Sequence, residues 1–255
     1  MKMGVIITLL ASLLLLPAIA GAETTEGWKF RITPYIWGAG TSGDITTNGE
    51  VSDFDASFGD VLKNLTMGAM ARGVATNGPW GIFIDGLWIN LKDLSETPNG
   101  DLTARIRMGF VTLGGAYRLA EIPLGNSEDT SVLSFEVNVG GRYTIMWSEL
   151  EPQWQPNVTS DSDWIDPVIG GRIIARLPAG FSIFTRGDIG GFGIGSASDL
   201  TWNLEGGLDY RVSELISIAA EYRCLSIKRY QGNGTDRNGI NMKLMGPAVG
   251  VSFIF

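Results

Sequence analysis

The chain ends with Met245-Gly-Pro-Ala-Val-Gly-Val-Ser-Phe-Ile-Phe255, and this stretch decides the fold class. Successive side chains of an extended strand point to opposite faces, so residues two positions apart share a face. One face of the stretch is therefore wholly apolar and ends in an aromatic ring, whereas the other is mostly small. The apolar face consists of Val249, Val251, Phe253 and Phe255.

The composition shows how the rest of the chain distributes its apolar residues. Of the 255 residues 44% are hydrophobic, with 35 glycines and 8 tryptophans. After Glu23, charged residues, asparagine or glycine interrupt every apolar run before it reaches the roughly 20 residues of a membrane-spanning helix. The chain has a high overall content of apolar residues but no long apolar run. It must therefore distribute these residues by alternation with polar ones, as the strands of a transmembrane barrel do.

The apolar stripe that closes on Phe255 resembles the ending of bacterial outer-membrane β-barrels, and the chain is similar in style to uncharacterised outer-membrane protein families of Gram-negative bacteria. In such a barrel the last strand seals against the first, so no strand edge is left unpaired in lipid. The resemblance implies an integral protein of the bacterial outer membrane, in contact with its lipid and lipopolysaccharide. It also implies that the barrel-assembly machinery recognises the C-terminal stripe as an insertion signal.

The N-terminal residues have the pattern of a secretory signal peptide. Lys2 is followed by an apolar stretch from Val5 to Leu16 and then by Ala20-Gly-Ala22, an A-x-A cleavage pattern. The alternative is a single membrane anchor, but the stretch is too short to cross about 30 Å of hydrocarbon. We therefore expect a cleaved peptide over 1–22 and one barrel domain over 23–255.

Alternating runs recur along the mature chain, separated by tight turns and by longer polar segments. They predict an all-β, antiparallel up-and-down barrel of ten strands, with eight as the alternative. An even number places both termini in the periplasm and the longer connections outside the cell. The predicted strands are Trp28–Trp37, Leu65–Ala75, Trp80–Leu91, Leu102–Leu119, Val132–Trp147, Trp164–Leu177, Phe181–Gly190, Leu200–Val212, Ile216–Lys228 and Ile240–Phe255.

The longest connection, 41–64, lies between the first two predicted strands. Within it, Ser57-Phe-Gly-Asp-Val-Leu62 could form a short helix that lies on the barrel mouth or folds inward as a plug. Its carboxylates Asp53, Asp55 and Asp60 could contact a divalent cation, but a solvated acidic loop explains them better. Elsewhere, Arg105 and Arg107 conflict with the outward face of Val111, which predicts a bulge near Gly109.

Aromatic residues recur at a spacing that fits a membrane. Trp80 and Trp88 share a face eight residues apart, and eight residues of a tilted strand rise roughly 20 Å along the membrane normal. Aromatic residues also favour strands in general, but a soluble sandwich has no reason to space them in this way. We predict a periplasmic girdle of Trp28, Trp80, Phe181, Tyr210 and Phe255, and an outer girdle of Trp88, Tyr143, Trp164 and Trp202.

If the apolar faces meet lipid, the alternate positions face the lumen and carry seven arginines, seven acids and no lysine. Arginine can bridge carboxylates with two parallel hydrogen bonds, and isolated buried charges are costly. A packed ion-pair network is therefore the first interpretation, and a polar pore is the second. The predicted network is Arg31, Arg72, Asp85, Glu136, Arg142, Asp166, Arg172, Arg186, Asp188, Glu205, Asp209, Arg211, Glu221 and Arg223.

Several function classes can be set aside. The formal net charge of −8 argues against nucleic acid as a partner. The chain contains no histidine, which removes the usual proton-shuttling hydrolase machinery, and Cys224 is its single cysteine. We expect no enzymatic activity, no metal and no cofactor. The expected role is structural or surface interaction, with a narrow porin-like channel for small solutes as the alternative; the sequence leaves the oligomeric state open.

Overall fold

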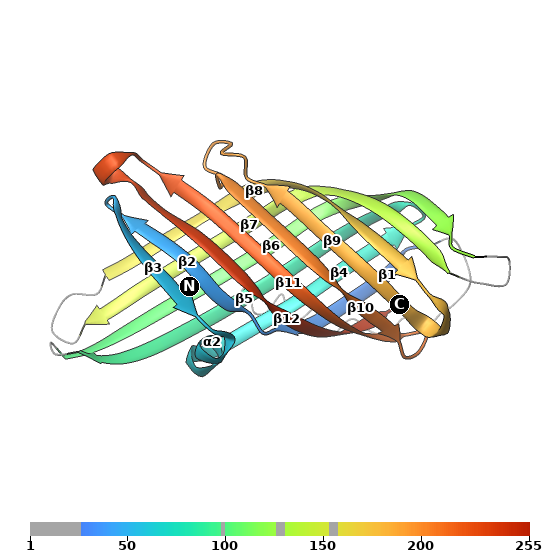
Figure 1. Ribbon diagram of the computed structural model, residues 1–255, viewed down its shortest axis with the longest axis horizontal. Coiled ribbons are helices and arrows are strands. Elements are labelled where there is room, and N and C mark those ends of the chain that lie inside the picture. The colour runs from blue at the N-terminus through green and yellow to red at the C-terminus, as the bar shows by residue number, and fades with distance from the viewer. Residues whose placement is uncertain (1–26, 98–99, 126–130, 153–157) are drawn as a thin grey trace.

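Ten antiparallel strands close into one barrel (Figure 1). The computed structural model describes residues 27–97, 100–125, 131–152 and 158–255, so the expected signal peptide lies outside the described residues. The barrel closes where β1 pairs with β12, which confirms the predicted ten strands and excludes eight. In order around the wall the strands are β1 (Lys29–Trp37), β4 (Leu65–Asn77), β5 (Trp80–Thr97), β6 (Gly100–Pro123), β7 (Val132–Pro152), β8 (Val158–Arg176), β9 (Phe181–Gly190), β10 (Leu200–Arg211), β11 (Ile216–Gln231) and β12 (Asn238–Ile254).

The two ends of the barrel differ. One end, here called the turn end, carries the C-terminus and tight connections such as the 3-10 turn Pro178–Gly180. At the other, the loop end, β5 and β7 run to Thr97 and Pro152, well past their predicted limits. These strand ends look like loops in the sequence because they are polar. A strand that extends beyond the lipid needs no apolar face, so its residues do not alternate between apolar and polar.

The C-terminal strand shows the alternation that specifies the wall. The side chains of Val249, Val251 and Phe253 are exposed on the outer face, and the ring of Phe255 is 64% exposed. The inward positions Leu244, Ala248 and Ser252 are nearly completely buried. The outer surface is therefore apolar along this strand, as a lipid-facing surface must be.

The segment 40–64 forms wall rather than plug. It contains two strands that the sequence did not predict, β2 (Gly40–Thr47) and β3 (Glu50–Ala56), and the helix α2 (Phe58–Asn64). β2 pairs with the first half of β12, and β3 pairs with β2 through a tight turn at Asn48 and Gly49, both with positive φ. The alternation of these strands is weak because their faces carry mostly polar residues.

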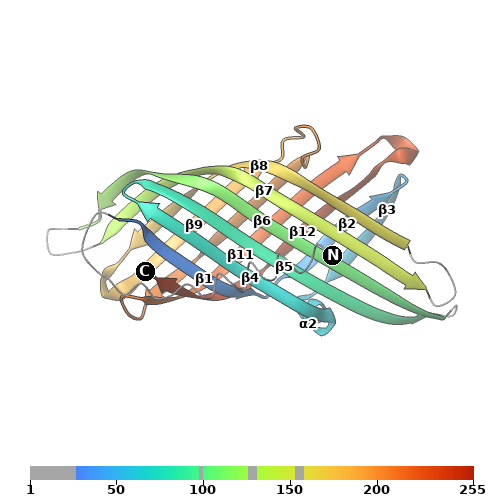
Figure 2. The same cartoon turned by 180° about the vertical axis from the view of Figure 1, so that it is seen from behind.

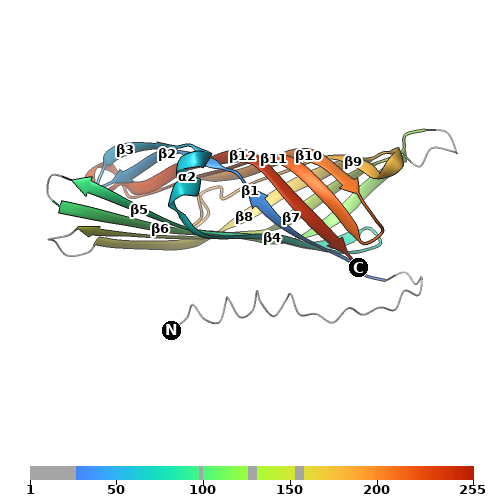
Figure 3. The ribbon, with the colours of Figure 1, turned by 90° about the horizontal axis from the view of Figure 1, so that it is seen from below.

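The wall is split twice toward the loop end. β1 pairs with β4 only as far as Pro34 opposite Ala71, and α2 bridges the divergence above that point. On the other side β8 pairs with β9 only as far as Val168, and the loop 191–199 lies against β8. Figures 1 and 2 show the result: β5–β8 extend as one sheet, while β11, β12, β2 and β3 extend as another. Figure 3 shows α2 between the two sheets.

Helix α2 is set by its first turn. Ser57 is the N-cap, and its hydroxyl accepts from the backbone N–H of Asp60 while the Asp60 carboxylate accepts from the backbone N–H of Ser57. The hydrogen bonds from Ser57 hold the pKa of Asp60 below its ordinary value. No residue of the helix is buried, so the predicted short helix forms and lies outside the lumen.

The predicted bulge near Gly109 is wrong. β5 and β6 pair without interruption from end to end, and the register shift of β6 falls between Arg118 and Ala120. Arg105 and Arg107 stay on the outward face, in the part of β6 near the loop end. There Arg105 pairs with Glu151 at 3.1 Å and Arg107 stacks on Trp147.

Among the described residues, no helix is long and apolar enough to cross a membrane.

Candidate functional site in the barrel lumen

The inward faces of the strands divide the lumen into three layers. On β5 the inward positions run Asp85, Leu87, Ile89 toward the loop end, and on β11 Arg223 is followed by Leu225 in the same direction. Two-residue alternation therefore places charge at mid-height and apolar side chains above it. A cavity occupies the turn end below the charges.

The middle layer is a balanced cluster of three arginines and three acids, here called the ion cluster. Glu205 is at its centre: it accepts from Arg72 Nη2 at 2.8 Å and from Arg186 Nε at 2.7 Å. Arg72 also pairs with Asp85 at 3.1 Å. The cluster consists of Arg72, Arg186, Arg223, Asp85, Glu205 and Glu221, and these side chains are largely buried.

Neutral side chains complete the ion cluster, and the sequence did not single them out. The Tyr35 hydroxyl donates to Asp85 at 2.7 Å and accepts from Arg223 at 2.8 Å. Asn203 donates to Glu205 at 2.9 Å and accepts from Arg223 at 3.0 Å. Both residues sit at inward positions of their strands, which is the signal that could have identified them. Their hydrogen bonds satisfy charges that would otherwise be costly to bury.

Arg142 forms a second buried contact beside the ion cluster. Its guanidinium, 1% exposed, donates to Asp188 at 2.6 Å, Thr201 at 2.8 Å and Thr112 at 3.2 Å. A cavity of about 110 Å³ lies between this contact and the ion cluster. The guanidinium thus has one carboxylate and two hydroxyls as acceptors.

Asp166 faces the lumen but is held without an arginine. It accepts from the backbone N–H of Ser198 at 2.6 Å and from the Trp164 indole at 3.0 Å. The prediction that Trp164 belongs to the outer girdle is wrong: its side chain is buried in the lumen. The reason is the alternation itself, since Trp164 and Asp166 are two residues apart and share a face. Together they anchor the loop 191–199 to β8.

The turn end opens into a cavity of about 590 Å³, here called the vestibule. Arg31 pairs with Asp209 at 3.4 Å, and Arg172 lies 3.7 Å from Glu136. Arg211 is exposed at the rim and makes no ion pair with a described residue. The fourteen predicted lumen residues therefore occupy inward positions but divide among separate groups.

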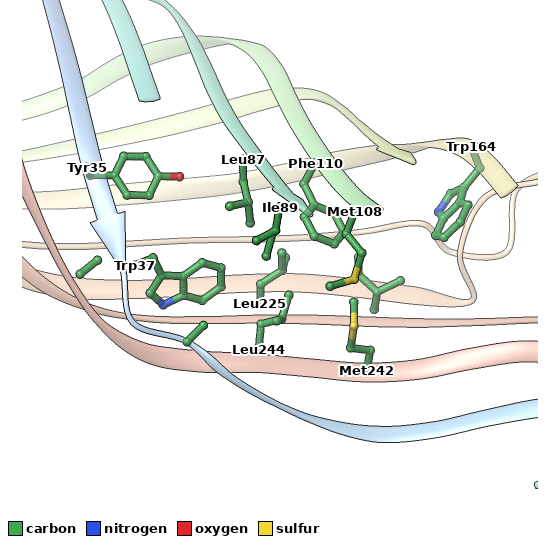
Figure 4. Close-up of a cluster of buried hydrophobic side chains, with 13 residues drawn as sticks. Tyr35, Trp37, Leu87, Ile89, Met108, Phe110, Trp164, Leu225, Met242 and Leu244 are labelled. Carbon is green, nitrogen blue, oxygen red and sulfur yellow. The ribbon is translucent and has the colours of Figure 1, made fainter. Parts of the chain in front are cut away.

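The inward side chains toward the loop end form an apolar layer (Figure 4). Leu87 and Phe110 meet Leu225 and Leu244 from the opposite wall, and their side chains are at most 4% exposed. Sequence reasoning missed this layer, although a run such as Leu87-Trp88-Ile89, apolar on both faces, is its signal. The buried cluster comprises Tyr35, Trp37, Ala39, Leu87, Ile89, Met108, Phe110, Trp164, Leu225, Ile227, Met242, Leu244 and Ala248.

The remaining predicted girdle residues lie on the outer face. Trp80 contacts Tyr117 edge-on, with ring centroids 4.6 Å apart, and Phe181 lies 4.7 Å from Tyr210. Both pairs are next to connections of the turn end. The other outward rings are Trp28, Trp88, Tyr143, Trp202 and Phe255. Their assignment to membrane girdles stays a prediction.

Metal ligands do not gather in the described part of the chain. No group of three or more Cys, Asp or Glu side chains that could hold an ion occurs among the residues the structure describes. In the β2–β3 hairpin Asp53 and Asp44 face each other across the strands, and Asp44 accepts from the Tyr230 hydroxyl at 2.7 Å. The acidic hairpin thus uses Asp44 for packing against β11.

Comparison with known proteins places the fold. No protein-family model and no curated protein sequence matches the chain. Among solved structures, the outer-membrane protease OmpT of Escherichia coli has a TM-score of 0.48 at 8% identity over 92% of this chain and 99% of its own. Ail of Yersinia pestis, in complex with a heparin analogue, has a TM-score of 0.40 at 11% identity, over 91% of this chain and 100% of its own. OprG of Pseudomonas aeruginosa has a TM-score of 0.34 at 16% identity, over 90% of this chain and 96% of its own.

At these identities and TM-scores the likeness concerns the fold alone and says nothing about activity. This chain closes its own sheet through the pairing of β1 with β12, and the wall has an apolar outer face. The chain has the fold of a closed, ten-stranded antiparallel β-barrel.

Proposed function

We propose that the chain is an integral outer-membrane β-barrel with a sealed lumen, acting through its wall and loop end in a structural or surface-interaction role. The observation that carries this proposal is the apolar layer across the lumen. Leu87, Phe110, Leu225 and Leu244 are nearly completely buried and belong to one apolar cluster directly above the ion cluster. A solute that crossed would have to leave a polar environment and displace packed apolar side chains.

The orientation in the membrane follows from the two ends. The turn end faces the periplasm, because short turns are typical of that side, and the loop end faces outward. The two extended sheets at the loop end are then the working surface. Outer-membrane lipid and lipopolysaccharide surround the wall. The assembly machinery acts on the outward stripe Val249, Val251, Phe253 and Phe255, which is exposed along β12.

The proposed role is non-catalytic. Three of the lumen carboxylates that a hydrolase could use as acid or base are already held by close hydrogen bonds. Glu205 is held by arginines and Asn203, Asp166 by Ser198 and Trp164, and Asp188 by Arg142. The chain has no histidine, so the side chain that usually shuttles protons in a hydrolase is missing.

A gated channel is the second candidate, and one observation favours it. The vestibule and the 110 Å³ cavity share lining residues, among them Arg72, Glu136, Arg172 and Arg186. A polar path therefore reaches from the turn end to the middle of the barrel. The apolar layer would have to move to complete it.

Single-channel recording separates the two candidates. The refolded chain Glu23–Phe255 in a planar bilayer is expected to be folded and silent. A variant with Leu225→Ser and Leu244→Ser serves as a positive control, because two hydroxyls in the apolar layer admit water. The matched control carries Leu204→Ala and Leu208→Ala on the lipid face. Discrete steps from the unmodified barrel that change in size with Arg142→Ala would establish the channel instead.

A further inference from the structure

The vestibule has an excess of positive charge. Apart from Arg72, Arg186 and Glu221 of the ion cluster, its lining contains six Lys or Arg side chains and two Asp or Glu side chains, so four positive charges are not balanced within it (6 − 2). The chain as a whole has a formal net charge of −8, and the ion cluster above is balanced. The excess is therefore a local property of the turn-end cavity.

Three of these arginines have weak partners or none. Arg172 lies 3.7 Å from Glu136, and its buried Nε has no hydrogen-bond partner. Arg31 reaches Asp209 only at 3.4 Å. Arg211 makes no ion pair with a described residue. By contrast, the other vestibule arginines Arg72, Arg118, Arg176 and Arg186 each have a carboxylate at normal hydrogen-bond distance or closer.

The weakly partnered arginines are also close enough to repel one another. Arg31 lies within electrostatic reach of Arg176 and Arg211, and Arg172 lies within reach of Arg31. Like charges held together in a partly desolvated cavity oppose folding unless an anion joins them. Guanidinium groups bind oxyanions such as phosphate with two parallel hydrogen bonds each.

We propose that the vestibule binds a small multivalent oxyanion of the phosphate class, with Arg31, Arg172 and Arg211 as its ligands. At about 590 Å³ the cavity also admits a phosphate ester with a small organic group. A sealed lumen makes the vestibule a blind pocket that is open to the periplasm. The site does not depend on that seal, since a conducting barrel would carry the same arginines.

Calorimetric titration of the refolded mature chain in a non-ionic detergent tests the site, with inorganic phosphate and pyrophosphate as probes. Saturable binding of one pyrophosphate per chain is expected, tighter than that of phosphate. Arg172→Gln and Arg211→Gln should each weaken it at least tenfold. Arg105→Gln is the matched control, because Arg105 pairs with Glu151 on the outside near the loop end, and should leave binding unchanged.

Circular dichroism verifies that each variant is folded. A folded, unmodified barrel that gives no saturable heat would overturn the proposal, and so would an equal loss of binding in the Arg105→Gln control. Adding phosphatidylglycerol to the detergent identifies the source of the phosphate: competition assigns the site to a lipid headgroup, and its absence assigns it to a soluble anion. The conductance of the barrel is a separate readout, so the two proposals can fail independently.

Discussion

Arg72 donates from Nη2 to Glu205 Oε2 at 2.8 Å across the lumen, although the two residues are 133 positions apart in the chain. They belong to β4 and β10, which are not neighbours in the wall. Arg186 and Arg223 pair with the same carboxylate. One acid thus joins arginines of three strands and braces opposite sides of the barrel against each other.

Removing that acid should strongly destabilise the barrel. Glu205→Ala leaves three buried guanidinium groups without their common partner, and breaking a buried ion pair from one side costs about 3–5 kcal/mol. Urea unfolding in lipid vesicles measures the loss. Glu151→Ala is the control, because its pair with Arg105 is far more exposed and is worth about 1 kcal/mol or less. Equal losses for the two variants would contradict a bracing role for Glu205.

A close approach of β6 and β7 requires glycine at position 140. A Cβ on Gly140 would lie 2.2 Å from the carbonyl oxygen of Leu113 and 2.8 Å from Cα of Gly114, both backbone atoms that cannot move aside. Gly140→Ala should therefore lower the midpoint of thermal unfolding. At Gly115 the nearest atom would be 3.9 Å away, so Gly115→Ala should be nearly neutral. A tolerated Gly140→Ala would mean that the two strands separate at little cost.

Leucines on the two faces of the wall should differ in what they contribute. Leu225→Ala leaves a cavity in the apolar layer and should cost about 3–5 kcal/mol. Leu204→Ala on the outer face loses contact with lipid, but lipid refills the space, so about 2 kcal/mol is expected from the lost methylene groups alone. Equilibrium unfolding of both variants in the same vesicles gives the comparison. A smaller loss for Leu225 would mean that the layer is loosely packed.

Acid should open the first turn of α2. The folded-state pKa of Asp60 is depressed by its hydrogen bonds from Ser57. The resulting stabilisation is present above the unfolded pKa and is lost as the pH falls through the lower, folded value. The protection factors of the helix amides, which compare their exchange rates with those of unstructured amides at the same pH, should fall there. Ser57→Ala removes the cap and should lower these protection factors at all pH values, with little dependence on the protonation of Asp60.

The sequence predicted the ten barrel strands correctly, but it predicted the segments outside them less well. Alternation along runs such as Ile216–Lys228 located ten strands, because lipid on one side and polar groups on the other impose a period of two. The same rule places Trp164 on the inward face together with Asp166, two residues away. The assignment of Trp164 to the outer girdle was wrong because it did not follow this rule. The strands β2 and β3 were missed because a wall outside the lipid carries no such contrast.

What the sequence by itself determined is therefore the number of barrel strands and the in-or-out position of most of their side chains, since both follow from a local two-residue period. The tertiary structure alone decided which charges meet. Strand tilt and the pairing of β1 with β12 set the height of each residue, and only that height brings Arg72 to Glu205 while leaving Arg172 without a close acceptor. The same stagger gathers Leu87 and Leu225 into one buried apolar layer.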